Sequence, residues 1–352
     1  MAAASVPAAP PGALVAVRKF LSQYGLIVVL LIMPVVFGIH DLRTEGDLSR
    51  LGNNLLDGLS NGSIWALVAI GYTLVYGIIE LINFAHGEVF MLGSFVSAGL
   101  FGVLGLTTDT PILGLVVGLL VTLVIAMIAQ GSLNVMIERV GYRPLRHAPK
   151  LAPLITAVGF SFILQNVGLL WRGGSQQSVP DLIDSQKELF TPFGISITNG
   201  DMLAIMVTIP LVLLMTTFIA RSRLGKAMRA TAQDPDAARL MGINVDTTIS
   251  LTFLLGGMLA GAAGLIYALY QTTIWYFQGF TAGLIAFTAA VMGGIGNIRG
   301  AVLGGIIIGC IQQMSDNRIG TQWTPAIVFA YLVLIMVFKP SGLLGEETRE
   351  AG

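Results

Sequence analysis

Three ionisable residues stand close together in an otherwise apolar part of the chain and are the first candidates for chemistry. Glu80, His86 and Glu88 lie within residues 71–95, GYTLVYGIIELINFAHGEVFMLGSF. A histidine and a carboxylate two residues apart could bind a metal or act as an acid–base pair, but no second His-rich cluster completes a zinc site. A turn between two spans near a solvated membrane edge, with Asn83 satisfying backbone groups, is the better interpretation.

The composition excludes a soluble protein and narrows the chemistry further. Of 352 residues, 55% are hydrophobic and only 11% are charged, whereas soluble domains carry about 25% charged residues. The lone cysteine, Cys310, excludes an intramolecular disulfide and a Cys-based metal cluster. The only Gly-Lys pair, Gly225–Lys226, is followed by Ala227, so no phosphate-binding loop occurs. Energy for any pumping must therefore come from a partner or an ion gradient.

Apolar runs predict the elements that position these residues. They indicate an all-α polytopic membrane protein with about 8–10 transmembrane segments. The first run follows Arg18 and Lys19 and lacks a clear cleavage site, which favours a retained span, kinked at Pro34, over a signal peptide. The run at 281–298 is weak and suggests a broken or re-entrant helix. The expected spans are 24–39, 55–79, 87–104, 112–137, 151–171, 202–220, 247–270, 281–298, 301–315 and 325–338.

The distribution of charge predicts the orientation. Ten crossings place every strongly basic loop on one side, which the positive-inside rule makes the cytoplasm, with both termini there. The count also allows two inverted five-helix repeats, an arrangement known in transporters, and a bundle without symmetry remains an open alternative. The basic positions are Arg18, Lys19, Arg139, Arg143, Arg146, His147, Lys150, Arg299, Lys339 and residues 221–246.

Residues 221–246, RSRLGKAMRATAQDPDAARLMGINVD, form a basic polar segment between two apolar runs. Helices are expected at about 224–232 and 235–241. Asp234 can cap the second helix, Pro235 fits its first position, and Gly242 can end it. The segment is either a solvated connecting loop or a docking surface for a cytoplasmic protein that moves the membrane part.

Three motifs in order carry a family resemblance: YTLVYGIIELINFAHGEVFMLGSFVS (72–97), SRLGKAMRATAQDPDAARLMGIN (222–244) and FTAAVMGGIGNIRGAVLGG (287–305). The chain resembles the H-type permease subunit of bacterial branched-chain amino-acid ABC importers. The similarity runs from about residue 53 to 345 and includes YRPLR (142–146) and KPSGLLG (339–345). Residues 53–345 are thus expected to be the permease domain, 346–352 a tail, and 1–52 an extension with an extra span that the shorter family pattern lacks.

The resemblance implies a multi-pass protein of the bacterial inner membrane that is not itself an enzyme. Its implied partners are an M-type permease forming a heterodimer, two ATPases that bind ATP-Mg, and a periplasmic or lipid-anchored substrate-binding protein. No cofactor is expected in this chain, and no nucleic acid. The implied contact with the ATPases comprises Gly225, Ala227, Met228, Ala230, Ala232, Asp234, Pro235, Asp236, Ala237 and Ala238.

Polar and aromatic residues within the spans are the candidates for the substrate path. Each could equally be a hydrogen bond between helices. Alternatives to the amino-acid importer are a urea or amide permease of the same family and an ion-coupled secondary transporter. An intramembrane enzyme is less favoured, because no convergent nucleophile, base or metal set is found. The path candidates are Tyr72, Tyr76, Asn83, Gln165, Asn166, Phe287 and Thr288.

Overall fold

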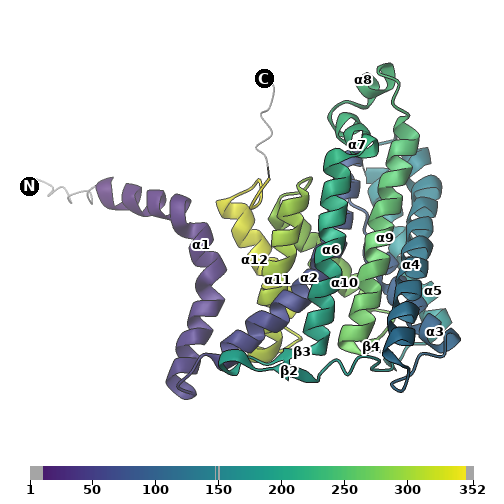
Figure 1. Cartoon of the computed structure of the whole chain (residues 1–352). Coiled ribbons are helices and arrows are strands. Elements are labelled where there is room, and N and C mark those ends of the chain that lie inside the picture. Colours follow the sequence, from purple (N-terminus) through teal and green to yellow (C-terminus); the bar gives the residue numbers. More distant parts are fainter. Residues whose placement is uncertain (1–10, 147, 150, 346–352) are drawn as a thin grey trace, which may run out of the picture.

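The chain folds as a bundle of membrane-length helices with one protruding end (Figure 1). The computed structural model describes residues 11–146, 148–149 and 151–345, and in these ranges nine helices are long and apolar enough to span a membrane, with a shorter tenth, α10. The ten are α1 (Pro11–Thr44), α2 (Ser49–Ile79), α3 (His86–Val103), α4 (Ile112–Ile137), α5 (Leu151–Arg172), α6 (Asn199–Arg221), α9 (Val245–Gln271), α10 (Gln278–Gly293), α11 (Ile298–Arg318) and α12 (Thr324–Phe338).

The remaining elements are short and lie at the two ends of the bundle. At the protruding end, α7 and α8 join α6 to α9, and a π-helix continues α4 (Figure 1). At the opposite end, β1 pairs with β4 and β2 with β3, both antiparallel. Their bounds are α7 (Arg223–Gln233), α8 (Pro235–Leu240), the π-helix (Glu138–Tyr142), 3₁₀ turns (Arg143–Leu145, Pro192–Gly194), β1 (Gln177–Ser178), β2 (Glu188–Phe190), β3 (Ile197–Thr198) and β4 (Thr273–Ile274).

The packing of the helices follows an inverted repeat. α2 packs along α11 and α4 packs along α9, so the second helix of each half contacts the fourth helix of the other half. The third helices, α3 and α10, run antiparallel, because Gly279 lies against Met91 while Gly283 lies against Gly87. These crossed pairs and the antiparallel third helices are the arrangement that two inverted five-helix repeats require.

Small residues bring α2 and α11 into backbone contact. A Cβ at Gly309 would overlap the backbone of Gly62, and one at Gly305 would overlap that of Ala66. The hydrophobic effect does not drive helix association in lipid, so the van der Waals packing that this close approach allows holds the two helices together. The core consists mainly of α2, α9 and α3, whereas α4, α5, α6 and α12 turn mostly outward.

Gly309→Ala is expected to destabilise the permease by about 1–3 kcal/mol, because the added methyl group meets rigid backbone. The thermal unfolding midpoint of the detergent-solubilised protein measures this. Gly102→Ala is the matched control, because a Cβ there has nothing within 4 Å. Equal midpoints for the two variants would contradict the close contact.

Several predicted boundaries differ from the structure. The predicted span 281–298 is wrong in extent, since α10 runs unbroken over Gln278–Gly293 and ends where Gly294 adopts a φ of 103°. α1 continues to Thr44, beyond the predicted end at residue 39, and α2 begins at Ser49, before the predicted start at residue 55. In both places the helix extends past the apolar residues from which the span was predicted. The strands near residues 172–200 were not predicted. Residues 1–10, the tail 346–352, His147 and Lys150 lie outside the described residues.

Candidate functional site

The protruding end of the bundle is built by α7 and α8, and their capping follows the sequence. The Ser222 side chain accepts a hydrogen bond from the Gly225 N–H at 2.9 Å and so begins α7. The Asp234 carboxylate accepts from the N–H groups of Asp236 and Ala237 at 2.9 and 3.0 Å and so begins α8. Both helices that the sequence predicted in this segment are confirmed.

Burial divides the predicted coupling residues into a supporting set and an exposed set. Gly225, Met228 and Ala238 are buried against the permease itself, and a Cβ on Gly225 would overlap the Ile219 backbone. Ala227 and Ala230 are half-buried. The exposed set comprises Ala232, Asp234, Pro235, Asp236 and Ala237.

Two apolar residues at the tip of α8 are not among the ten residues that the family resemblance implied for the ATPase contact. Leu240 is 90% exposed and Met241 is 82% exposed, the former being the most exposed large apolar side chain of the described residues. Both lie beyond the hydrocarbon-length helices, where lipid cannot cover them (Figure 1). The sequence signal for their exposure was their position at the end of a short helix, directly before the helix-terminating Gly242. Such exposed apolar side chains mark a protein contact.

Asp234→Ala is expected to loosen α8 by about 0.5–2 kcal/mol, because two backbone N–H groups lose their acceptor. Hydrogen–deuterium exchange of the α8 peptide should rise accordingly. Asp234→Asn should exchange nearly as slowly as the wild type, since asparagine caps equally well. Unchanged exchange in the alanine variant would show that the cap does not stabilise this helix.

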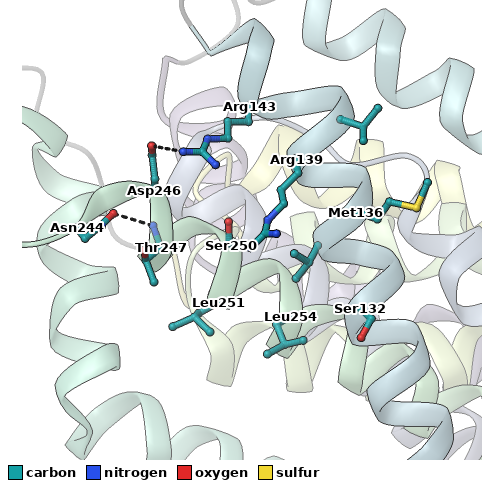
Figure 2. A pocket seen from close by; sticks show the side chains of 12 residues that line it. Ser132, Met136, Arg139, Arg143, Asn244, Asp246, Thr247, Ser250, Leu251 and Leu254 are labelled. Carbon is teal, nitrogen blue, oxygen red and sulfur yellow. Dashed lines mark hydrogen bonds and ion pairs between the residues drawn. The ribbon is translucent and has the colours of Figure 1, made fainter.

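A charged cluster joins the end of α4 to the start of α9. It lies where the 221–246 segment leads into α9. The fully buried Glu138 contacts the Arg146 guanidinium and accepts a hydrogen bond from the Ser250 hydroxyl at 2.7 Å. Arg146 also pairs with Asp246, which Arg143 contacts at 2.8 Å (Figure 2). The cluster fastens the two helices together where α8 is attached.

The path candidates of both halves meet beside α3. The Tyr72 ring lies edge-on to His86 at 4.9 Å and to Phe287 at 6.1 Å between centroids. Tyr76 lines a cavity of about 10 Å³ with Tyr72 and Phe287. That volume holds no more than about one water. Thr288 is fully buried on the same helix as Phe287.

The other path candidates lie elsewhere. Asn83 donates to the Asn134 side chain at 3.2 Å and accepts from the Tyr142 hydroxyl at 3.2 Å, which is a network linking helices. On α5, Gln165 is half-buried and Asn166 is exposed, with its amide donating to the Phe162 carbonyl. The structure therefore groups Tyr72, Tyr76 and Phe287, with Thr288 buried beside Phe287 in sequence, but not these three.

His86 and Glu88 are fully buried, so their expected position near a solvated edge is wrong. The turn at 80–85 folds inward, and α3 begins at His86 inside the bundle. The Ser161 hydroxyl donates to Glu88 at 3.2 Å, and Gly279 lies against the same carboxylate. Within the described part of the chain no group of three His, Cys, Asp or Glu residues could hold a metal.

Comparison with known proteins decides the family. The family model described as "Branched-chain amino acid transport system / permease component" matches residues 54–337. The chain belongs to this family. It is a multi-pass membrane permease, a membrane subunit of a transport system, as the motifs predicted.

Several relatives agree with this membership. The high-affinity branched-chain amino acid transport permease LivH of Salmonella typhimurium is 42% identical, over 83% of this chain and 94% of the relative. BraD of Pseudomonas aeruginosa, named for the same transport, is 41% identical over 83% and 94%. The autoinducer 2 import permease LsrC of Escherichia coli is 26% identical over 91% and 88%. Similar permeases thus carry names for different cargoes.

Proposed function

We propose that the chain is the H-type permease of an ATP-driven importer for branched-chain or related hydrophobic amino acids. The observation that carries the proposal is the pairing of a capped, protruding α7–α8 segment with a membrane bundle that has small-residue contacts and a central aromatic cluster. The identity of 41–42% to permeases named for branched-chain amino acids supports the cargo.

The basic end of the bundle is the cytoplasmic end under this proposal. Arg143, Arg146, Arg229 and Arg299 all lie at the end that carries α7 and α8. The positive-inside rule then sets the orientation, with β2 and β3 outside. Two ATPases dock in the cytoplasm, a second permease of the M-type completes the path, and a binding protein delivers the substrate from outside.

Coupling runs from α8 into the bundle. Binding of ATP to the partner displaces the exposed tip of α8, and α9 follows because it begins at Val245, directly beyond that tip. α4 moves with α9 through the Glu138–Arg146–Asp246 cluster. Binding of the ATP-loaded partner then shifts the permease toward the conformation that binds this partner more tightly.

The aromatic cluster is the proposed constriction of the path. Tyr72, Tyr76 and Phe287 supply apolar walls with hydroxyl groups, which suit a zwitterion with an apolar side chain that must bind briefly and leave. Selection among amino acids then lies mainly in the binding protein.

Purification from detergent-solubilised membranes, followed by ATPase measurement, tests the proposal. The expected result is recovery of two kinds of subunit besides the chain, a second permease and ATPases, with hydrolysis stimulated by leucine plus binding protein. Stimulation by urea or an amide instead would change the cargo, and uptake by the lone chain driven by an ion gradient would overturn the proposal.

A further inference from the structure

A groove of about 680 Å³ opens on the outer side of the bundle between the end of α4 and the start of α9 (Figure 2). It lies at the basic end, and none of its lining residues belongs to the aromatic cluster or to the exposed tip of α8. The proposed transport cycle uses Asp246 on its wall through the charged cluster, but not the open space of the groove. Its walls carry polar side chains near the charged cluster and apolar ones along α4, chiefly Met136, Arg139, Arg143, Thr247, Ser250 and Leu254.

The groove has an excess of positive charge. Arg139, Arg143 and Asp246 line the groove, and Arg146 and Glu138 belong to the adjoining charged cluster, so three guanidinium groups and two carboxylates leave one positive charge in excess. Arg143 and Arg146 are held in ion pairs. The Arg139 side chain is exposed, has no ion pair with any described residue, and reaches across the groove toward α9 in Figure 2.

The surface next to the groove is apolar and continuous with the membrane face of α4. Met136 is 56% exposed and Val140 is 60% exposed on that wall. Only 11% of the apolar window of α4 is buried by the rest of the chain. A small soluble anion would use the arginine alone, whereas a lipid would use both the arginine and this apolar face.

We propose that the α4–α9 groove binds the phosphate headgroup of an anionic phospholipid, with its acyl chains lying along α4. Arg139 supplies the unpaired charge, and the Thr247 hydroxyl and Asn244 amide lie on the opposite wall as further donors. Basic pockets between membrane helices on the cytoplasmic side are suited to such headgroups. The lipid would then sit on the charged cluster that fastens α4 to α9, independently of the cargo.

Native mass spectrometry of the assembled transporter in detergent tests the site with three probes: phosphatidylglycerol, phosphatidylcholine with the same acyl chains, and glycerol 1-phosphate. Phosphatidylglycerol is expected to bind more tightly than phosphatidylcholine, and glycerol 1-phosphate is expected not to displace it. Arg139→Gln should weaken phosphatidylglycerol binding about fivefold, as one lost charge at an anionic surface predicts. Arg139→Lys should keep most of it.

Arg221→Gln is the matched control, because Arg221 is an exposed arginine in the last turn of α6 at the same end of the bundle. Its binding should stay within about twofold of wild type, a smaller loss than that at Arg139. Equal losses for the two variants, or none at Arg139, would overturn the site. Displacement by glycerol 1-phosphate would make it a soluble-anion site, and binding to the lone chain but not to the assembly would make it a subunit interface; either result overturns the lipid proposal.

Discussion

Replacing both Leu240 and Met241 with serine is expected to cost the permease its ATPase partner while leaving its fold intact. Both side chains are almost fully exposed in this chain, so serine removes no contact within it. Burial of two such apolar side chains in a partner contributes about 3–5 kcal/mol, which corresponds to at least about a hundredfold in affinity. Co-purification of ATPase with the permease pair, and leucine uptake by vesicles, should both fall to background.

The double exchange Leu240→Met with Met241→Leu is the control, because it keeps the apolar area and changes only its shape. This variant should retain ATPase within about tenfold of wild type, since volume-conserving swaps cost less than about 1.5 kcal/mol. Normal ATPase recovery with the serine variant would mean that the partner does not contact the tip of α8, and docking would then have to involve the exposed face of α7.

The short helices of the 221–246 segment could be predicted because their signals are local. Asp234, Pro235 and Gly242 each act on neighbouring backbone groups, and the structure uses Asp234 as the cap of α8. Which face of these helices points outward depends on how they pack on α6 and α9. For that reason Met228 and Ala238 were expected at a partner contact but are buried, whereas Leu240, which is not among the ten residues implied for the ATPase contact, is exposed.

Long-range pairs explain the other differences between prediction and structure. Arg146 contacts Asp246 across 100 residues of sequence, and no local pattern marks that pair. The basic loop around Arg146 was interpreted as a sign of orientation and as part of the family resemblance, not as an ion pair with α9. Similarly, His86 looked close to solvent because it follows the end of an apolar run, but the inward turn before α3 buries it.

Arg146→Met is expected to destabilise the permease by about 3–5 kcal/mol, because it leaves the fully buried Glu138 carboxylate without its cation. The Ser250 hydroxyl alone would remain as a donor to that carboxylate. The thermal unfolding midpoint and the yield of inserted protein should both drop markedly. Arg143→Met, which breaks an exposed pair with Asp246, should cost no more than about 1 kcal/mol.

Adding Glu138→Gln to Arg146→Met separates stability from transmission of movement. Glutamine carries no charge and can still accept from Ser250, so the double variant should regain most of the lost stability. Because the exposed Arg143–Asp246 pair is then the only ion pair of the cluster left between the end of α4 and α9, ATP hydrolysis should continue while leucine uptake falls severalfold. Full recovery of uptake together with stability would mean that the cluster only holds the helices in place, and that movement of α8 reaches α4 by the packed glycine face of α9 instead.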